Sequence, residues 1–235
     1  EIWIKRDSKQ YYMQFESGAK SKDLEEIGEV GKRNTGTLIK FSPDPQYFDT
    51  VKFSIKNLRH NLRSKAVLCP GLEVNFVNEI DETTDKWLFE DGIKDYLQAS
   101  LDGLDCIPAI PFVISSKTKE EQLNCALTWT ENTTNTTAES FVNLIPTIGG
   151  GTHVNGLRSG LTDALKEFCE FRSLIPKNIK LTPDDVWQNI AFVLSIKILD
   201  PQFSGQTKER LSSRECASFV SGVVKDSFSL WLNQH

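Results

Sequence analysis

The chain has 235 residues, a length that fits one large domain or two small ones. Its 27 Lys and Arg residues against 32 Asp and Glu residues leave a net charge of −5, which excludes a globally basic nucleic-acid coat but leaves room for a local basic patch. Hydrophobic residues make up 39% of the chain, which excludes a disordered protein, and no apolar run approaches the roughly 18 residues of a membrane helix.

Cysteine and histidine are too few and too scattered to indicate a zinc site. The 5 cysteines form no C-x-x-C pair, and the chain has only 3 histidines. We therefore expect no structural metal, and free thiols of the kind found in a reducing cytosol. Two glycosylation sequons, at Asn132 and Asn135, are interpreted as chance matches in a polar loop.

The first 91 residues combine short strand patterns with one helical pattern. Apolar-rich stretches at 2–5 and 11–15 flank a polar turn and predict a β-hairpin. A polar, glycine-bearing stretch without a predicted element follows, up to Thr37. Further strands are predicted at 38–41, 72–76 and 87–89, and a helix at 51–68.

The predicted helix at 51–68 is strongly basic. It carries several Lys and Arg residues and lies in a stretch without any acid between Asp49 and Glu73. Such a helix is more often a solvated face than a DNA-binding surface, and we interpret it as a solvated face.

A turn at Asp91-Gly92 marks the predicted domain boundary. Beyond it strands and helices are mixed without an internal repeat, which is typical of an α+β or α/β fold. Two helix starts carry capping signals, at Thr182-Pro183-Asp184-Asp185 and at Ser212-x-x-Glu215. Helices are predicted from 93, 152, 182 and 212, strands at 112–114, 123–129, 141–145 and 190–198, and a polar hairpin loop at 131–138.

Three loop segments have residue types that suit a ligand. Gly149-Gly150-Gly151 precedes a helix and could bring N–H groups to an anion, but a turn that needs positive φ is the favoured interpretation. In the loop 200–208, Gln206 and Lys208 suit a terminal phosphate, although from composition alone solvated side chains are favoured. The hydroxyl groups of the turn 32–37 could bind the edge of a ligand or cap the turn's own backbone, and the residue types fit both interpretations. No G-x-S-x-G or H-E-x-x-H motif is present.

Five long runs in collinear order identify a family. They are KRNTGTLIKFSPD (32–44), KAVLCPG (65–71), GGGTHVNGLRSGLTDALKEFCE (149–170), SIKILDPQFSGQTKERLSSRE (195–215) and VSGVVKDSFSLWLNQ (220–234). Together they resemble the B subunit of bacterial type IIA DNA topoisomerases over the whole chain. KAVLCPG, the CEFR at 169–172 and KDSFSLWLNQ favour the topoisomerase IV type over the gyrase type.

The resemblance implies an α+β fold in two parts. Residues 1–91 resemble the C-terminal portion of a GHKL-type ATPase sandwich, and residues 92–235 a transducer domain with the ribosomal protein S5 domain 2-like fold. The family's catalytic Glu, Mg²⁺-binding Asn, adenine-binding Asp and ATP lid would all lie upstream of Glu1. We therefore expect the chain to open inside the ATPase domain and not to hydrolyse ATP in isolation.

The resemblance also carries site residues over by position. Lys208 matches the transducer lysine that contacts the γ-phosphate of ATP and serves catalysis, and Gln206 a neighbouring phosphate contact. Thr37 matches a threonine near the adenine, and Arg6 an arginine at the mouth of the pocket. Arg158 matches a basic residue that faces the captured DNA. No metal ligand is expected, because the Mg²⁺ ligand lies upstream.

The resemblance implies ATP-dependent decatenation and relaxation by passage of one duplex through another. The expected partners are the A subunit of topoisomerase IV, a second copy of the B subunit when ATP binds, and double-stranded DNA, with no membrane. The expected compartment is the bacterial cytoplasm, at the nucleoid. The alternative is a non-catalytic transducer or interaction module of another GHKL protein, of the mismatch repair or Hsp90 type.

Overall fold

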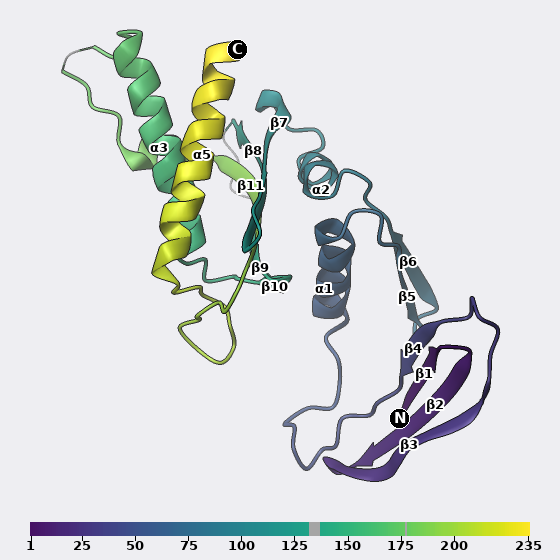
Figure 1. Ribbon diagram of the computed structural model, residues 1–235. Helices are drawn as coiled ribbons and strands as arrows, with labels where there is room; N and C mark the ends of the chain where they lie inside the picture. The colour runs from purple at the N-terminus through teal and green to yellow at the C-terminus, as the bar shows by residue number, and fades with distance from the viewer. Residues whose placement is uncertain (132–136, 177) are drawn as a thin grey trace. The chain divides into compact units, whose positions relative to one another are not determined.

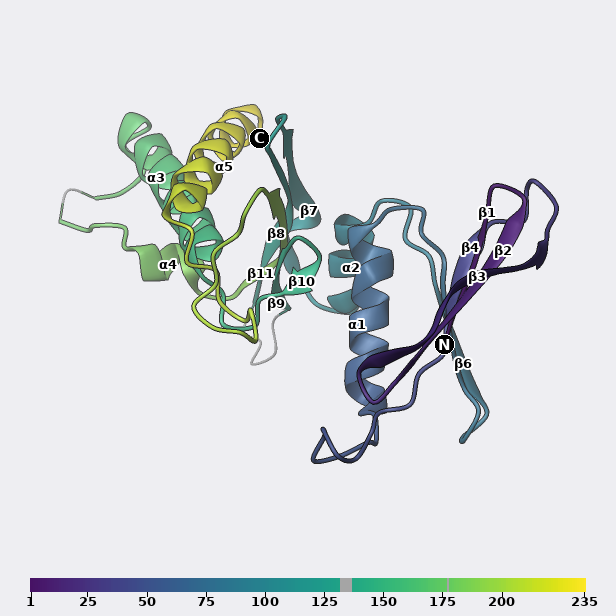
Figure 2. The ribbon, with the colours of Figure 1, turned by 60° about the horizontal axis from the view of Figure 1, so that its bottom comes forward.

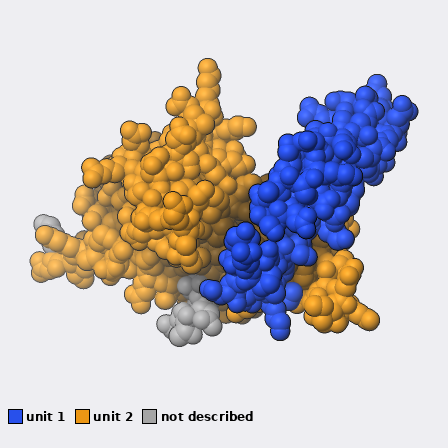
Figure 3. Space-filling model, turned by 90° about the horizontal axis from the view of Figure 1, so that it is seen from below, with its two compact units in different colours: residues 1–55 blue, residues 56–235 orange. Residues whose placement is uncertain are grey.

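A computed structural model of the chain describes residues 1–131, 137–176 and 178–235 (Figure 1). The chain forms two compact units, residues 1–55 and 56–235, which Figure 3 colours separately. The boundary predicted at Asp91-Gly92 falls inside the second unit and stays a prediction. Most of the loop predicted at 131–138 lies outside the described residues. Among the described residues, no helix is both long enough and apolar enough to span a bilayer.

Unit 1 contains a four-stranded antiparallel sheet with strand order β3-β2-β1-β4. Its strands are β1 (Ile2–Arg6), β2 (Lys9–Glu16), β3 (Ala19–Glu29) and β4 (Gly36–Ile39). The predicted hairpin is confirmed, and Asp7 and Ser8 turn it with φ of 53° and 65°, as a two-residue type I′ loop requires. The sequence pattern does not predict β3, because all its residues are exposed and no face has to be apolar.

Unit 2 contains a five-stranded sheet with strand order β10-β9-β11-β8-β7. The strand predicted at 190–198 is confirmed as β11, which lies at the centre, antiparallel to β8 and parallel to β9. The single strand predicted at 141–145 is wrong, because Asn143 and Leu144, with φ of 48° and 67°, form a tight turn. The strands are β7 (Cys106–Lys117), β8 (Glu121–Thr130), β9 (Ala138–Val142), β10 (Ile145–Pro146) and β11 (Ile190–Ile198).

Helices cover both faces of this sheet (Figures 1 and 2). Helices α3 (Thr152–Phe171) and α5 (Arg214–Gln234) lie on one face, and α2 (Ile93–Ser100) lies on the other. Because strand side chains alternate between faces, Leu194 and Ile196 of β11 join the core under α3 and α5, whereas Val193 joins the core under α2. Burial on both sides explains why residues 190–194 of β11 are a continuous apolar run.

Helix α1 (Ile55–Leu68) is followed by a hairpin of β5 (Val74–Asn78) and β6 (Thr83–Trp87). The interpretation of this helix as a solvated basic face is wrong for Arg59, Arg63 and Lys65. Arg59 pairs with Asp85 of β6 at 2.6 Å, and the Arg63 guanidinium lies 4.9 Å from the ring centroid of Tyr96 in α2. The Lys65 ammonium donates to a backbone carbonyl in the β9–β10 turn. These three cationic groups therefore have partners within unit 2 and are not simply solvated.

The helix caps divide into one confirmed and one wrong prediction. The short helix α4 (Pro183–Trp187) has the predicted N-cap Thr182, whose side chain accepts from the Asp185 N–H, and the structure adds the reciprocal bond of a capping box. The capping box predicted for Ser212 is not formed, because α5 begins one residue later with Ser213 as its N-cap. The Ser212 hydroxyl instead donates to the Gln202 carbonyl at 3.1 Å. This bond ties Ser212 to the loop before α5, so its side chain does not cap the helix.

Two glycines allow α3 and α5 to pack closely. A Cβ at Gly156 would lie 2.6 Å from the Ala217 carbonyl oxygen, and one at Gly160 would lie 2.6 Å from the Ser221 carbonyl oxygen. Both distances are shorter than a van der Waals contact, so the helix backbones approach as closely as they do only because these side chains are absent.

We expect Gly160→Ala to destabilise the chain by about 1–3 kcal/mol, because the added methyl group overpacks the α3–α5 contact. The measurement is the urea unfolding midpoint, followed by circular dichroism of the helices. Gly222→Ala is the matched control, since a Cβ at this position on α5 meets nothing within 4 Å. Gly222→Ala should leave the free energy of unfolding unchanged or raise it by up to about 1 kcal/mol, because alanine has the higher helix propensity. Equal midpoints for the two variants would contradict the close approach.

Candidate functional site

The loop between β11 and α5 carries the predicted phosphate ligands on a short hairpin. Ser204 N–H donates to the Arg210 carbonyl at 3.0 Å, and Ser212 N–H donates to the Gln202 carbonyl at 2.8 Å. Leu211 lies between these bonds with only 1% of its surface exposed and belongs to the core under α3 and α5. Residues 202–204 and 210–212 therefore form a rigid base, and residues 205–209 form the exposed tip.

The tip presents Gln206 and Lys208 to solvent. Lys208 N–H donates to the Gly205 carbonyl at 3.1 Å, and Lys208 has a φ of 57°, which makes the tip a tight turn. The Lys208 ammonium lies over the ring of Phe203, 6.0 Å from its centroid. Gln206 is exposed. An ammonium and an amide within three residues can donate to a phosphate, so the donor set fits a nucleotide's terminal phosphate.

The N–H groups of Gly149 and Gly150 in the glycine turn already have backbone partners. The Gly149 N–H donates to the Glu209 carbonyl at 2.9 Å, and the Gly150 N–H donates to the Thr147 carbonyl at 2.9 Å. The Thr152 N–H, in the first turn of α3, donates to the Leu211 carbonyl at 3.1 Å. These donors already have partners, and the interpretation as a turn is confirmed. Gly150 has a φ of 62°, a conformation that glycine adopts without strain, which explains a glycine at this position.

A buried polar chain lies beneath this turn. The His153 Nε2 is 3.0 Å from the Thr147 hydroxyl, which is 2.7 Å from the Ser140 hydroxyl. His153 is 0% exposed, and its Nδ1 has no hydrogen-bond partner among the described residues. Burial lowers the pKa of His153 from 6.5 to about 4, because the protonated ring cannot be hydrated there.

Arg158, the predicted DNA contact, is engaged within unit 2. Its guanidinium forms an ion pair with Asp184 and lies over the ring of Trp187, 5.8 Å from the centroid. Asp184 is the more exposed partner, with 89% of its side chain accessible. The carboxylate of the pair is therefore open to solvent, whereas the Arg158 guanidinium is only partly accessible.

The other two predicted nucleotide ligands, Thr37 and Arg6, belong to unit 1. Thr37 of β4 lies opposite Ile4 of β1, and Arg6 ends β1 two residues further along. Because alternate residues of a strand share a face, Arg6 and Thr37 lie on the same side of the sheet. Arg6 is exposed and its Nε lies 3.5 Å from the Asp7 carboxylate. Gln206 and Lys208 belong to unit 2.

Metal ligands are not grouped within the described residues. No cluster of three or more His, Cys, Asp or Glu side chains with a geometry for a metal ion occurs among them. All five cysteines have free thiols, and Cys125 and Cys216 are buried. Burial raises the pKa of the Cys216 thiol to about 12, so this thiol stays protonated and unreactive.

Residues 92–235, the greater part of unit 2 with the whole loop and α3, match the family model described as DNA gyrase B. The chain belongs to the DNA gyrase B family. The match includes the hairpin with Gln206 and Lys208 and the helix with Arg158.

Relatives of the topoisomerase IV type match the whole chain. It is 57% identical to the B subunit of DNA topoisomerase 4 from Pseudomonas aeruginosa and 54% identical to that from Haemophilus influenzae, covering 100% of this chain in both cases. The chain spans 37% of the length of these curated relatives. This identity supports the topoisomerase family over the mismatch repair or Hsp90 alternative.

A solved structure shares the fold. The ATP-binding domain of topoisomerase IV from Francisella tularensis, in complex with a small-molecule inhibitor, is 44% identical and superposes with a TM-score of 0.84. The match covers 100% of this chain and 64% of that chain. The α+β fold is therefore that of the ATPase region of this family, and it includes the transducer region.

The sequence predicts the loop at 200–208 with Gln206 and Lys208, but neither its hairpin form nor the residues that hold it. Leu211, Phe203 and Thr147 carry no distinctive pattern, because their contacts are backbone bonds and core packing between segments far apart in the chain. The glycine triplet is the one available signal, since it indicates a turn where backbones approach.

We expect the stability of the chain to fall as the pH is lowered through the range that protonates His153. The unfolded ring has an ordinary pKa near 6.5 and the folded ring about 4, so below pH 6.5 protons bind preferentially to the unfolded state. Between pH 7.5 and pH 5 this group costs ~2 kcal/mol of unfolding free energy. His153→Gln should lack this loss in urea unfolding at the two pH values. A pH dependence identical to that of the unaltered chain would show that His153 is not the group.

Proposed function

We propose that this chain is the segment of a topoisomerase IV-type B subunit that couples ATP hydrolysis to the passage of one DNA duplex through another. One observation carries the proposal: the hairpin tip offers an exposed Lys208 and Gln206 from a base anchored in the core of a chain that matches such proteins over its whole length. An ammonium on a rigid base is suited to detect one phosphate group.

In this proposal Lys208 senses the γ-phosphate of ATP. A lysine is a compact point charge, so its contact with the nucleotide depends on the terminal phosphate being in place. The same charge stabilises the negative charge that develops on the phosphate during hydrolysis. Loss of the phosphate removes the contact, and the loop with the fold that holds it is then released from the nucleotide. Gln206 adds an amide donor to the same phosphate.

The finer assignments follow the same resemblance. Residues 1–91 are the C-terminal portion of the GHKL-type ATPase domain, and residues 92–235 are the transducer with the S5 domain 2-like fold. Thr37 lies near the adenine and Arg6 at the mouth of the pocket. ATP is the cofactor, with Mg²⁺ held by residues outside this chain. When bound, the ion supplies charge neutralisation for the phosphates.

The proposed partners are those of topoisomerase IV. The A subunit supplies the rest of the heterotetramer, a second B subunit pairs with the first when ATP binds, and double-stranded DNA is the substrate. The proposed compartment is the bacterial cytoplasm. The net charge of −5 fits DNA contacts that are few and transient, made by single cations to phosphates.

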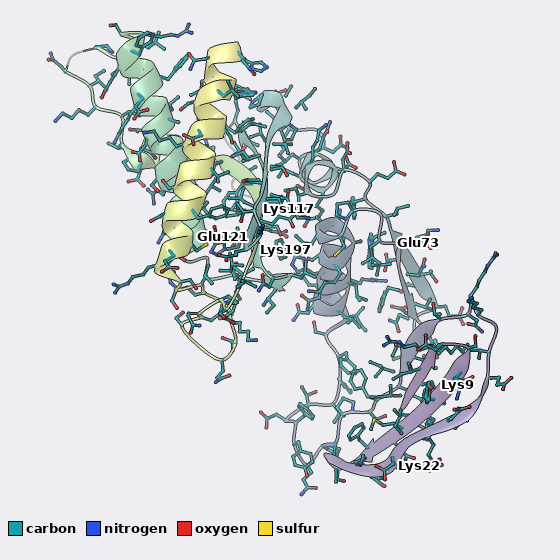
Figure 4. All side chains as sticks on the ribbon, viewed as in Figure 1. Lys9, Lys22, Glu73, Lys117, Glu121 and Lys197 are labelled. Carbon is teal, nitrogen blue, oxygen red and sulfur yellow. The ribbon has the colours of Figure 1, made fainter. Side chains whose placement is uncertain are left out.

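We expect Lys208→Ala, in a full-length B subunit that carries this segment, to lower ATP turnover by about a hundredfold or more while nucleotide binding changes little. Turnover is measured with the A subunit present, and binding with a non-hydrolysable ATP analogue. Lys117→Ala is the matched control, because Lys117 is an exposed lysine at the end of β7 and does not belong to the loop (Figure 4). Unchanged turnover in Lys208→Ala would remove the role given to Lys208.

Arg158 is the proposed DNA contact, and Asp184 competes with DNA for it. Asp184→Asn should therefore strengthen the stimulation of ATP turnover by DNA at low salt, and Arg158→Ala should weaken it. Intrinsic turnover without DNA should stay unchanged in both variants. The slope of DNA affinity against salt concentration should fall by about one in Arg158→Ala, since one phosphate contact is lost. If DNA affinity depended on salt concentration with the same slope in the unaltered subunit, Asp184→Asn and Arg158→Ala, a phosphate contact at Arg158 would be contradicted.

A further inference from the structure

A second backbone segment lies along the loop that carries Lys208. Residues 149–152, the glycine turn and the first residue of α3, pair with residues 209–211, which follow Lys208 directly. The Gly149 N–H donates to Glu209 O at 2.9 Å, the Leu211 N–H to Gly150 O at 3.1 Å, and the Thr152 N–H to Leu211 O at 3.1 Å. We call this pairing the glycine clamp.

Two further bonds secure the clamp. The Arg210 guanidinium donates to the Gly149 carbonyl at 2.9 Å, so a side chain of the loop reaches back across the pairing. The Gly150 N–H donates to the carbonyl of Thr147, which is 2% exposed, and this ties the turn to the core. The clamp therefore connects the loop to the buried end of α3 and not only to the neighbouring residues of its own hairpin.

Gly151 is the position where the clamp needs a glycine. A Cβ there would lie 2.6 Å from the Leu211 nitrogen and 2.9 Å from its carbonyl carbon, and closer still to its carbonyl oxygen. These are backbone atoms, which cannot turn away as a flexible side chain can. The φ of 136° at Gly151 adds strain for any other residue. A Cβ at Gly149 would lie 3.2 Å from Glu209 O, a milder conflict.

The clamp and the hairpin base hold Lys208 from both directions. On one side, residues 202–204 bond to residues 210–212. On the other side, Gly149 bonds to Glu209, the residue next to Lys208. With Leu211 buried between the two segments, the backbone of the loop can hardly shift without breaking several hydrogen bonds at once.

We propose that Gly151 is a positioning residue for Lys208: the close approach that it permits fixes the loop so that the Lys208 ammonium reaches the terminal phosphate in the geometry that hydrolysis requires. The inference rests on the proposed function of Lys208. A displacement of about 1 Å at a catalytic group can cost on the order of a hundredfold in rate, which makes a backbone contact at this point matter for chemistry.

The test is made in a full-length B subunit that carries this segment, with the A subunit present. Gly151→Ala should lower kcat for ATP at least about tenfold and leave KM within about twofold, because the loop is displaced but the nucleotide still binds. Gly149→Ala should give a smaller fall in kcat. Gly222→Ala, with nothing within 4 Å of the added Cβ, is the control and should leave both constants unchanged.

A double variant shows whether Gly151 acts through Lys208. Adding Gly151→Ala to Lys208→Ala should cause no further fall in kcat. If Gly151 acts only by positioning the Lys208 ammonium, its substitution has no effect on kcat once that ammonium is absent. Multiplying effects would overturn the inference, as would an unchanged kcat in Gly151→Ala or a rise in KM alone. If Gly151→Ala does not fold, Gly149→Ala takes its place in the double variant. Its addition to Lys208→Ala should likewise cause no further fall in kcat.

The outcomes also separate this inference from the proposed function. Unchanged turnover in Lys208→Ala alone defeats both, because there is then no lysine to position. A large loss in Lys208→Ala with full activity in the two glycine variants defeats the clamp and leaves the sensing role of Lys208 intact.

Discussion

Unit 2 depends on the burial of β11 on both of its faces. This strand has helices α3 and α5 on one side and α2 on the other, and it pairs with β8 along its whole length. It ends at Ile198, immediately before the loop that carries Gln206 and Lys208, and that loop returns the chain to α5. A strand that is buried on both faces therefore leads into the loop, and Leu211, on the far side of the loop, packs in the core that includes Leu194 and Ile196 of β11.

Patterns imposed by burial or by helix ends could be predicted from the sequence. Residues 190–194 of β11 are an apolar run because both faces of the strand are covered, and Thr182 precedes a proline and two acids, which together define a helix start. Patterns that depend on tertiary contacts could not be predicted. β3 is exposed throughout, Ser212 bonds to Gln202 and not to a helix N–H, and Arg59 pairs with a strand distant in sequence.

The candidate site divides in the same way. Lys208 and Gln206 follow from family resemblance, since a lysine and a glutamine in a loop carry no distinctive pattern. The partners that fix them bond through backbone atoms, and backbone bonds leave little trace in side-chain identity. Gly151 is the exception, because a close approach of two backbones excludes every other residue and so appears in the sequence as a glycine.

The central claim is that the Lys208 ammonium contacts the γ-phosphate of a bound nucleotide triphosphate, in place of its position over the Phe203 ring. The most direct measurement is a crystal structure of a full-length B subunit carrying this segment with a non-hydrolysable ATP analogue. The account predicts the Lys208 ammonium within about 2.7–2.9 Å of a γ-phosphate oxygen, the range of a charge-assisted hydrogen bond. A bound triphosphate with the Lys208 ammonium still over the Phe203 ring would contradict it.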